Sequence, residues 1–311
     1  MGLVQKFILM KILITGSNGF LGKIIYTYLS NDNIHEIFTL SRSNSDYNFD
    51  LTKDSITFHK KFDLVIHCAG FAHIQTAKNS EIDCFFKVNV EGTLNLLSGL
   101  SFNQAPKGFI LISTVSVYGL IVGENINEDF SLHANNPYGK SKMEAEFVVR
   151  KWCEENNIVC TILRLPLVVG FNPPGNLGAM IKGIQKGIYF NIAGGSAKKS
   201  MVLASDIAKY ILKASEIGGI FNLTDGYHPS FFELSENISC QLGKSRSKNL
   251  PFWLAKVLAR IGDFFGVKAL LNSDKLCKIT SDLTFDDTKA REAFGWDPTP
   301  VLNGFKISDT D

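Results

Sequence analysis

The chain has 311 residues, which is enough for one large domain or two modest ones. Hydrophobic residues make up 45% of it and charged residues 20%, a balance that excludes an intrinsically disordered or collagen-like chain. The formal net charge is +2, whereas a nucleic-acid-binding surface would need a strong basic bias, so we expect no nucleic-acid partner.

The first predicted strand covers Lys11–Thr15, and the apolar residues 7–10 run directly into it. No small-residue cleavage site of the kind that ends a signal peptide precedes this strand. Met10 is therefore a candidate for the true start of the protein, with residues 1–9 as an upstream extension.

A glycine motif, Gly16-Ser17-Asn18-Gly19-Phe20-Leu21-Gly22, follows this strand and opens a helix predicted over residues 21–29. In such a motif the glycines allow a tight turn, a close approach to a pyrophosphate and close packing of helix on strand. The N-terminus of the helix faces the anion. The motif therefore predicts a dinucleotide site with contacts from Gly16, Asn18, Gly19, Phe20, Leu21 and Gly22.

Short β-branched runs then alternate with helical stretches, the pattern of βαβ units and a parallel sheet. The predicted strands are residues 37–40, 64–68, 108–113 and 159–164, and the predicted helices are residues 85–100 and 138–156. The predicted fold class is α/β, a doubly wound parallel sheet of the NAD(P)-binding Rossmann type.

After Pro166 the sequence changes to loops and shorter elements, with helices at 177–186 and 204–214, a strand at 219–223 and mostly helical sequence beyond. We predict a Rossmann domain from residues 10–169 plus about 200–224. Residues 170–199 and 225–311 form the predicted smaller, mostly helical substrate lobe.

The end of the second strand carries Ser41-Arg42-Ser43, and no acidic residue appears before Asp46. An acid at this place holds the ribose 2′-hydroxyl of NAD, whereas an arginine with hydroxyls suits the 2′-phosphate of NADP. The sequence therefore favours NADP through Arg42, and NAD stays open as the alternative.

Tyr138 and Lys142 lie four residues apart, one turn apart on one face of the predicted helix. The charge of the lysine favours the phenolate, so we expect a lowered pKa for Tyr138 and proton exchange nearer neutral pH. A tyrosine that transfers protons beside a dinucleotide site predicts a nicotinamide-dependent oxidoreductase.

These features together resemble the extended short-chain dehydrogenase/reductase family, in particular its nucleotide-sugar epimerases, reductases and dehydratases. The resemblance covers nearly the whole chain. The stretches that carry it are the glycine motif, Asp50-Leu51-Thr52, His67-Cys68-Ala69-Gly70, Asn89-Val90-Glu91-Gly92-Thr93, Ser113–Gly119 (residues 113–119), Tyr138–Lys142 (residues 138–142) and Leu163-Arg164, with weaker matches at residues 199–206, 221–226 and 294–298.

The resemblance implies that Tyr138 is the catalytic acid/base, that Lys142 binds the nicotinamide ribose, and that Thr114 hydrogen-bonds the reacting sugar oxygen. The implied cofactor contacts, besides those above and Tyr138 and Lys142, are Asp50, Leu51, Cys68, Ala69, Gly70, Asn89, Ser113 and Pro166. The implied substrate contacts are Thr114, Ser116, Tyr138, Asn176 and Lys199. Family 4,6-dehydratases place an Asp-Glu pair directly after the threonine; here Val115-Ser116 stand there, which argues against that reaction.

The sequence from Arg164 to Gly170, followed by Asn176, resembles a branch acting at C4 of UDP-linked hexosamines. Leu167 replaces an asparagine that many members carry, and Lys199 replaces an arginine that clamps the diphosphate with two parallel hydrogen bonds. Arg42 and the short path from the second strand to Asp50 favour a UDP-4-keto-6-deoxy-hexosamine 4-reductase in surface-polysaccharide synthesis among the activities that this resemblance implies. A UDP-hexose or UDP-N-acetylhexosamine 4-epimerase is the alternative, and a non-catalytic dinucleotide-binding regulator is the second.

The remaining reactive residues favour structural roles. The six cysteines show no metal-ligand spacing, so we expect reduced thiols, no metal and a cytoplasmic location. His67 is interpreted as structural, and no catalytic role is assigned to His67, His73 or His228.

Two further expectations concern helices in the sequence. Residues 252–267 are the most apolar later stretch, but Arg260 and Asp263 interrupt them, so we expect a helix that covers the cleft or packs on the core, with no stable membrane insertion. By analogy with the family, we expect a homodimer through helices 85–100 and 138–156.

Overall fold

A seven-stranded parallel sheet forms the centre of the computed structural model, which describes residues 9–53, 56–72, 79–101, 105–266, 269 and 271–307. The strand order is β11-β7-β5-β4-β1-β2-β3. The strands are β1 (Lys11–Thr15), β2 (Glu36–Ser41), β3 (Tyr47–Asn48), β4 (Leu64–His67), β5 (Gly108–Thr114), β7 (Val159–Leu165) and β11 (Gly219–Asn222). This arrangement confirms the predicted doubly wound α/β fold.

The chain order of the strands reverses at β1, which has β2 on one side and β4 on the other. Thr15, the last residue of β1, is in register with Leu40 and with His67. The loops that leave these strands therefore start side by side. A Cβ built on Gly16, whose φ is +66°, would lie 2.7 Å from the backbone nitrogen of Ala69, so only glycine fits at this crossing. Ligands of open parallel sheets bind at this kind of reversal.

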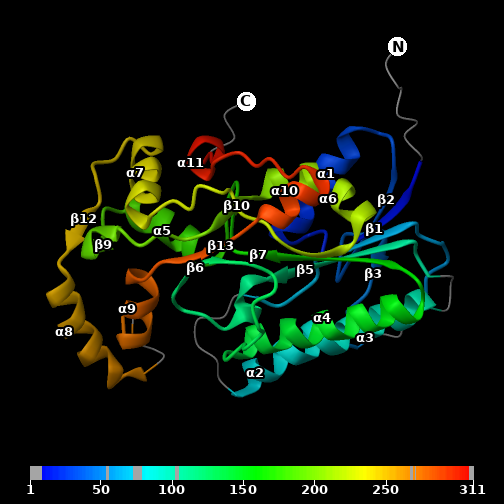
Figure 1. The fold of residues 1–311 in the computed structure, drawn as a ribbon, viewed down its shortest axis with the longest axis horizontal. Coiled ribbons are helices and arrows are strands. Elements are labelled where there is room, and N and C mark those ends of the chain that lie inside the picture. Colours follow the sequence, from blue (N-terminus) through cyan, green and yellow to red (C-terminus); the bar gives the residue numbers. More distant parts are fainter. Residues whose placement is uncertain are drawn as a thin grey trace, which may run out of the picture.

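Helices cover both faces of the sheet (Figure 1). One face is covered by α1 (Phe20–Asn31) and α6 (Ala204–Ile217), which pack with Ile25, Ile207 and Ile211 in one buried cluster. The other face is covered by α2 (Asn79–Phe86), η1 (Lys87–Glu91), α3 (Gly92–Ser101) and α4 (Pro137–Glu155). Leu96, Val149 and Cys153 contribute to the buried cluster on that side. These helices position the ends of β4 and β5 against the start of α4.

Short elements build the rest of the chain, several of them around smaller apolar clusters, one of which includes Val169, Leu177, Leu234 and Phe305. They are η2 (Val115–Tyr118), β6 (Gly123–Ile126), β8 (Leu167–Val169), α5 (Gly175–Gln185), β9 (Phe190–Ile192), η3 (Ala193–Gly195), β10 (Met201–Leu203), α7 (Phe231–Gln241), β12 (Lys248–Leu250), α8 (Phe252–Asp263), α9 (Ser273–Thr280), β13 (Leu283–Phe285), α10 (Thr288–Phe294) and α11 (Val301–Gly304). The domain boundaries drawn from the sequence stay a prediction.

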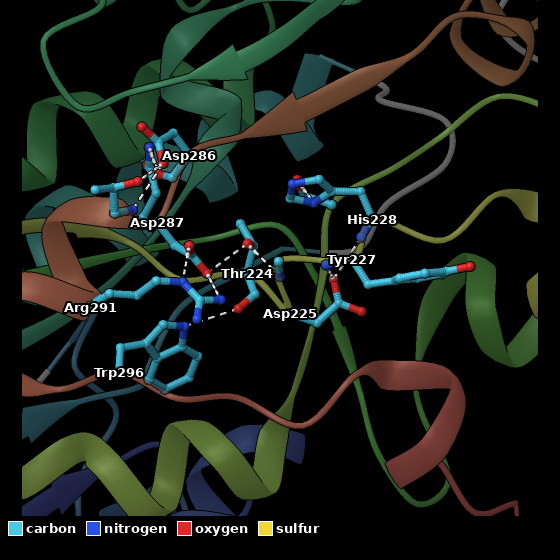
Figure 2. A network of polar contacts seen from close by, with 12 residues as sticks. Thr224, Asp225, Tyr227, His228, Asp286, Asp287, Arg291 and Trp296 are labelled. Carbon is cyan, nitrogen blue, oxygen red and sulfur yellow. Dashed lines mark hydrogen bonds and ion pairs between the residues drawn. The ribbon is translucent and has the colours of Figure 1, made fainter.

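A polar network ties the C-terminal segment to the loop after β11 (Figure 2). Asp287 accepts hydrogen bonds from Thr224 and, at 2.7 Å, from the Arg291 guanidinium. The Trp296 indole donates to the backbone oxygen of Thr224 at 3.0 Å, and Asp225 accepts from three backbone N–H groups. These bonds hold the loop after a sheet strand against the last third of the chain.

Helix α8 packs inward through its small residues in a minor apolar cluster, and the expectation that it covers the cleft stays a prediction. Its buried residues are Ala255, Ala259 and Gly262, while Trp253 and Phe252 are exposed. Across the described ranges, no helix combines the length and the apolarity that crossing a membrane would require.

Candidate active site

The proton-transfer pair lies where α4 begins beside the end of β5. Asn136 caps the helix by accepting the backbone N–H of Gly139 at 2.8 Å, and Pro137 occupies the first turn. Tyr138 then lies beside Thr114, the last residue of β5, whose hydroxyl acts against the rise in pKa that burial causes in the phenol. The structure thus brings together the two residues predicted to contact the reacting oxygen.

The pKa of Tyr138 is shifted in the opposite direction to the sequence-based expectation. Burial raises the pKa of Tyr138 above its usual value of 10.0, and the Thr114 hydroxyl opposes this only in part. Burial also lowers the pKa of Lys142 to about 8, although Glu146 and Cys68 favour its charged form. Lys142 is itself desolvated, and its charge interacts with Glu146 and Cys68. Because burial raises the pKa of Tyr138, this residue is a phenol at neutral pH.

The glycine motif fits a dinucleotide pyrophosphate. Helix α1 follows Gly19, and among the described residues no side chain caps it and no acid occupies its first turn. Its first N–H groups therefore point to a place that suits an anion. A Cβ on Gly22 would lie 2.3 Å from the oxygen of Gly16, so the turn closes only with glycine there.

The residues at the end of β2 are serines and an arginine, and the first acid after the strand is engaged within the fold. Asp46, the first acid after the strand, accepts both the backbone N–H and the hydroxyl of Thr39, at 2.8 and 2.7 Å. Ser41 hydrogen-bonds Ser17 across the strand ends at 3.0 Å. Arg42 is exposed and forms no ion pair with any residue that the structure describes.

Asn89 lies in a π-helical turn, Lys87–Glu91, that interrupts the single helix predicted over residues 85–100. Its amide accepts the backbone N–H of Phe71 at 2.7 Å and donates to the hydroxyl of Ser141 at 2.9 Å. Ser141 in turn donates to the backbone oxygen of Tyr138 at 2.8 Å. The wider turn therefore lets one side chain hold both the loop after β4 and the start of α4.

His67 is buried as a structural residue. The Thr93 hydroxyl donates its proton to the backbone oxygen of Asn89 at 2.7 Å. Toward Nε2 of His67, 2.9 Å away, this hydroxyl can therefore only accept. Nδ1 then accepts from the Thr15 hydroxyl at 2.6 Å. Both ring nitrogens are engaged in the neutral form, and burial lowers the pKa of His67 to about 3.

This histidine predicts an acid-sensitive fold. A group whose pKa is depressed on folding contributes stability above its unfolded pKa of 6.5, and that stability is lost as the pH falls toward the folded value of about 3. We expect the free energy of unfolding to fall by roughly 1 kcal/mol per pH unit through this window from His67 alone. Urea unfolding of wild type and His67→Gln measures it, because the amide can both donate and accept without titrating. Equal pH slopes for the two proteins would contradict the assignment.

The sequence reasoning missed a buried ionic network behind the site. Arg164 at the end of β7 pairs with Glu146 of α4 at 2.8 Å, and both side chains are 3% exposed. Ser113 also donates to Glu146, and Arg164 donates to the Tyr118 hydroxyl at 3.0 Å. Burial alone lowers the pKa of Arg164, but the hydrogen bonds and charge of Glu146 outweigh it and raise that pKa. The available signal was spacing, because Glu146 follows Lys142 by another helical turn.

Several predicted contacts lie on the same side of the fold without a described link to Tyr138. Leu51 is buried, while Asn176 is exposed at the start of α5. Lys199 sits near Asp282, and burial lowers the pKa of Lys199 to about 8. The predicted contacts of Ser116, Asp50, Leu51, Cys68, Ala69, Gly70, Pro166, Asn176 and Lys199 stay predictions.

The outer side of α4 carries a hollow of about 580 Å³, lined in part by Phe86, Met143 and Phe147. Phe147 is exposed, as is Leu94 of α3. The homodimer through these helices stays a prediction. His73 lies outside the described residues, and within the described ranges no group of acids, cysteines and histidines could hold a metal ion.

Comparisons with known proteins agree with this geometry. Residues 12–223 match the NAD dependent epimerase/dehydratase family. The UDP-glucose 4-epimerase of Vibrio cholerae is 26% identical over 95% of this chain and 93% of its own. The N-acetyl-alpha-D-glucosaminyl-diphospho-ditrans,octacis-undecaprenol 4-epimerase of Escherichia coli O157:H7 is 28% identical over 91% and 89%. The structure of RMD from Pseudomonas aeruginosa complexed with NADPH has a TM-score of 0.71 at 21% identity, covering 94% of this chain and 95% of that one.

Proposed function

The chain belongs to the NAD dependent epimerase/dehydratase family, and from this premise we propose that it is an NADPH-dependent 4-ketoreductase of a UDP-4-keto-6-deoxy-hexosamine. One relative is the UDP-glucose 4-epimerase of Vibrio cholerae, and the protein is a nicotinamide-dependent enzyme of the nucleotide-sugar epimerase/dehydratase type. The observation that carries the proposal is the placement of Tyr138 beside Thr114, with Lys142 one helical turn behind.

The chain's own residues handle the proton. A bound nicotinamide supplies the hydride to C4. Tyr138 donates its phenolic proton to O4 as the carbonyl becomes an alcohol, and Thr114 donates a hydrogen bond to the same oxygen. Lys142, in its charged form, stabilises the phenolate left on Tyr138. Solvent then returns the proton.

The raised pKa of Tyr138 fits the role of a proton donor. Its raised pKa keeps the phenol protonated at neutral pH, which is the form that a proton donor needs. A 4-epimerase must begin with a tyrosinate that removes the O4 proton. Val115 and Ser116, which follow Thr114 in a 3-10 turn, supply no acid or base for a dehydration.

The second candidate is a UDP-hexose or UDP-N-acetylhexosamine 4-epimerase, supported by the relative from Vibrio cholerae, which is a UDP-glucose 4-epimerase. One assay separates the two. The purified protein is denatured to identify any released nicotinamide, and the native protein is followed at about 340 nm with NADPH and a UDP-4-keto-6-deoxy-hexosamine. Little bound cofactor and consumption of NADPH support the reductase. Tightly held NAD, no net absorbance change and interconversion of UDP-glucosamine and UDP-galactosamine types support the epimerase.

Arg42 gives a prediction on cofactor choice. The exposed guanidinium at the end of β2 can bind a 2′-phosphate through charge-assisted hydrogen bonds, which the NADH ribose does not offer. We expect Arg42→Ala to reduce the ratio of kcat/KM for NADPH over NADH by about 10- to 100-fold. Lys209→Ala, an exposed cation of α6, is the control. If Arg42→Ala lowers both values equally, the arginine does not select the phosphate.

A further inference from the structure

Helix α8 turns its large apolar side chains away from the protein. The side packed inward carries Ala255, Ala259 and Gly262, and a Cβ on Gly262 would lie 1.9 Å from the oxygen of Leu271. Trp253 is 68% exposed, and Phe264, directly after the helix, is 91% exposed. The small residues thus allow a close contact with the protein, while the residues that normally form a core face outward.

The outward residues form a continuous apolar face. At about 100° of rotation per residue, Trp253, Val257 and Phe264 fall on one line along the helix, opposite Ala255 and Ala259. The exposed residues of this α8 face are Trp253, Val257, Leu258, Ile261, Phe264 and Phe265. In Figure 1, α8 lies at the left edge of the molecule beside α9, at the end opposite β1, β2 and β3. A contiguous patch of this kind marks an interaction site.

Basic residues accompany the α8 face. Lys256 and Arg260, both exposed, lie together along one flank of it. Residues 243–280 contain eight basic and two acidic residues, although the whole chain has a net charge of only +2. One of those two acids, Asp263, is engaged with Ser273, accepting its hydroxyl at 2.6 Å. Aromatic residues on an apolar face with cations at its border are typical of helices that lie in a membrane interface.

We propose that the α8 face docks this protein on the surface of a bilayer that contains anionic lipids. Trp253, Phe264 and Phe265 enter the boundary between headgroups and acyl chains, and Lys256 and Arg260 pair with lipid phosphates. The helix lies in the plane of the membrane and does not cross it. This inference rests on α8 alone and does not depend on the proposed reaction.

A second copy of the chain fits this face less well. The face is a single ridge about 20 Å long, formed by one helix of 12 residues and the two phenylalanines that follow it. Pairing two copies through α8 would also bring together the cations of both helices. A bilayer needs neither a matching surface nor a large area, since it accommodates a convex ridge.

The test is sedimentation of the purified full chain with vesicles of phosphatidylcholine alone and of phosphatidylcholine with phosphatidylglycerol. We expect binding to the anionic vesicles that decreases with salt. Ile261→Glu on the α8 face should weaken this binding by about tenfold or more. Ile217→Glu at the end of α6 is the matched control, because the two isoleucines are 52% and 51% exposed, and it should bind as wild type does.

A second pair of variants tests the charges. Lys256→Gln with Arg260→Gln should lower binding to anionic vesicles by about tenfold. Lys209→Gln with Lys213→Gln, also one helical turn apart but on α6, should leave it unchanged. Failure of wild type to sediment with anionic vesicles overturns the proposal, as does equal binding by Ile261→Glu. A loss of dimer mass on Ile261→Glu without vesicle binding assigns the face to a second copy.

Discussion

Replacing Tyr138 by phenylalanine is expected to lower turnover by about 10²- to 10⁴-fold, the usual contribution of a positioned proton donor. The substitution removes one hydroxyl and keeps the ring, which lies 5.9 Å from that of Phe85. The cap of α4 uses Asn136 and the N–H of Gly139, so the helix start is unchanged. The loss should therefore appear in kcat and leave the binding of NADPH and the melting temperature close to wild type.

The matched control is Tyr227→Phe, which removes a hydroxyl hydrogen-bonded to Glu233 at an exposed position. It should change turnover by less than about twofold. Reduction of the 4-keto sugar, followed by absorbance at about 340 nm, measures both variants. If Tyr138→Phe turns over like wild type, the proton comes from another group. If wild type and Tyr138→Phe both bind NADPH but neither turns over a keto sugar or a hydroxy sugar, the result supports the non-catalytic dinucleotide-binding regulator.

The layout of the sheet could be predicted because its strands bury both faces and read as apolar runs between turn signals. Strands 11–15, 64–67 and 108–114 are of this kind, and their order follows from the right-handed crossovers of a doubly wound sheet. Two- and three-residue strands such as β3 and β9 were not predicted. They form by pairing with distant segments, and so few residues carry no periodicity of their own.

The site could be predicted as far as local patterns reach. The glycine motif and the spacing of Tyr138 and Lys142 each act within one element or turn. The direction of the pKa shift of Tyr138 could not be predicted from the sequence. It depends on how strongly the tertiary structure desolvates the phenol and the lysine. The partner of Glu146 was likewise hidden, since Arg164 comes from another element of the fold.

The orientation of α8 also could not be predicted from the sequence alone. Its amphipathic pattern was visible in the sequence and predicted a helix with one apolar face. Such a pattern does not say which face meets the protein. Here the small residues Ala255 and Ala259 allow α8 to approach its neighbours closely, and the apolar face turns outward.

Removing one member of the buried pair between Glu146 and Arg164 is expected to destabilise the fold strongly. In Arg164→Met the Glu146 carboxylate keeps its position among buried groups but loses the guanidinium that approaches it at 2.8 Å. Breaking such a pair leaves an uncompensated charge, so we expect the free energy of unfolding to fall by about 3–5 kcal/mol. Urea unfolding at neutral pH measures the loss.

The same helix offers the control. Lys151 and Glu155 form an ion pair at 3.9 Å with both side chains at least 60% exposed, and Lys151→Met should cost less than about 1 kcal/mol. The double variant Glu146→Leu with Arg164→Met should recover much of the stability lost by Arg164→Met, because it removes both charges and fills the space with apolar groups. If Arg164→Met is no more harmful than Lys151→Met, the pair does not hold α4 to β7. If the double variant is more stable than Arg164→Met, the lost free energy of unfolding in Arg164→Met comes from the unpaired carboxylate.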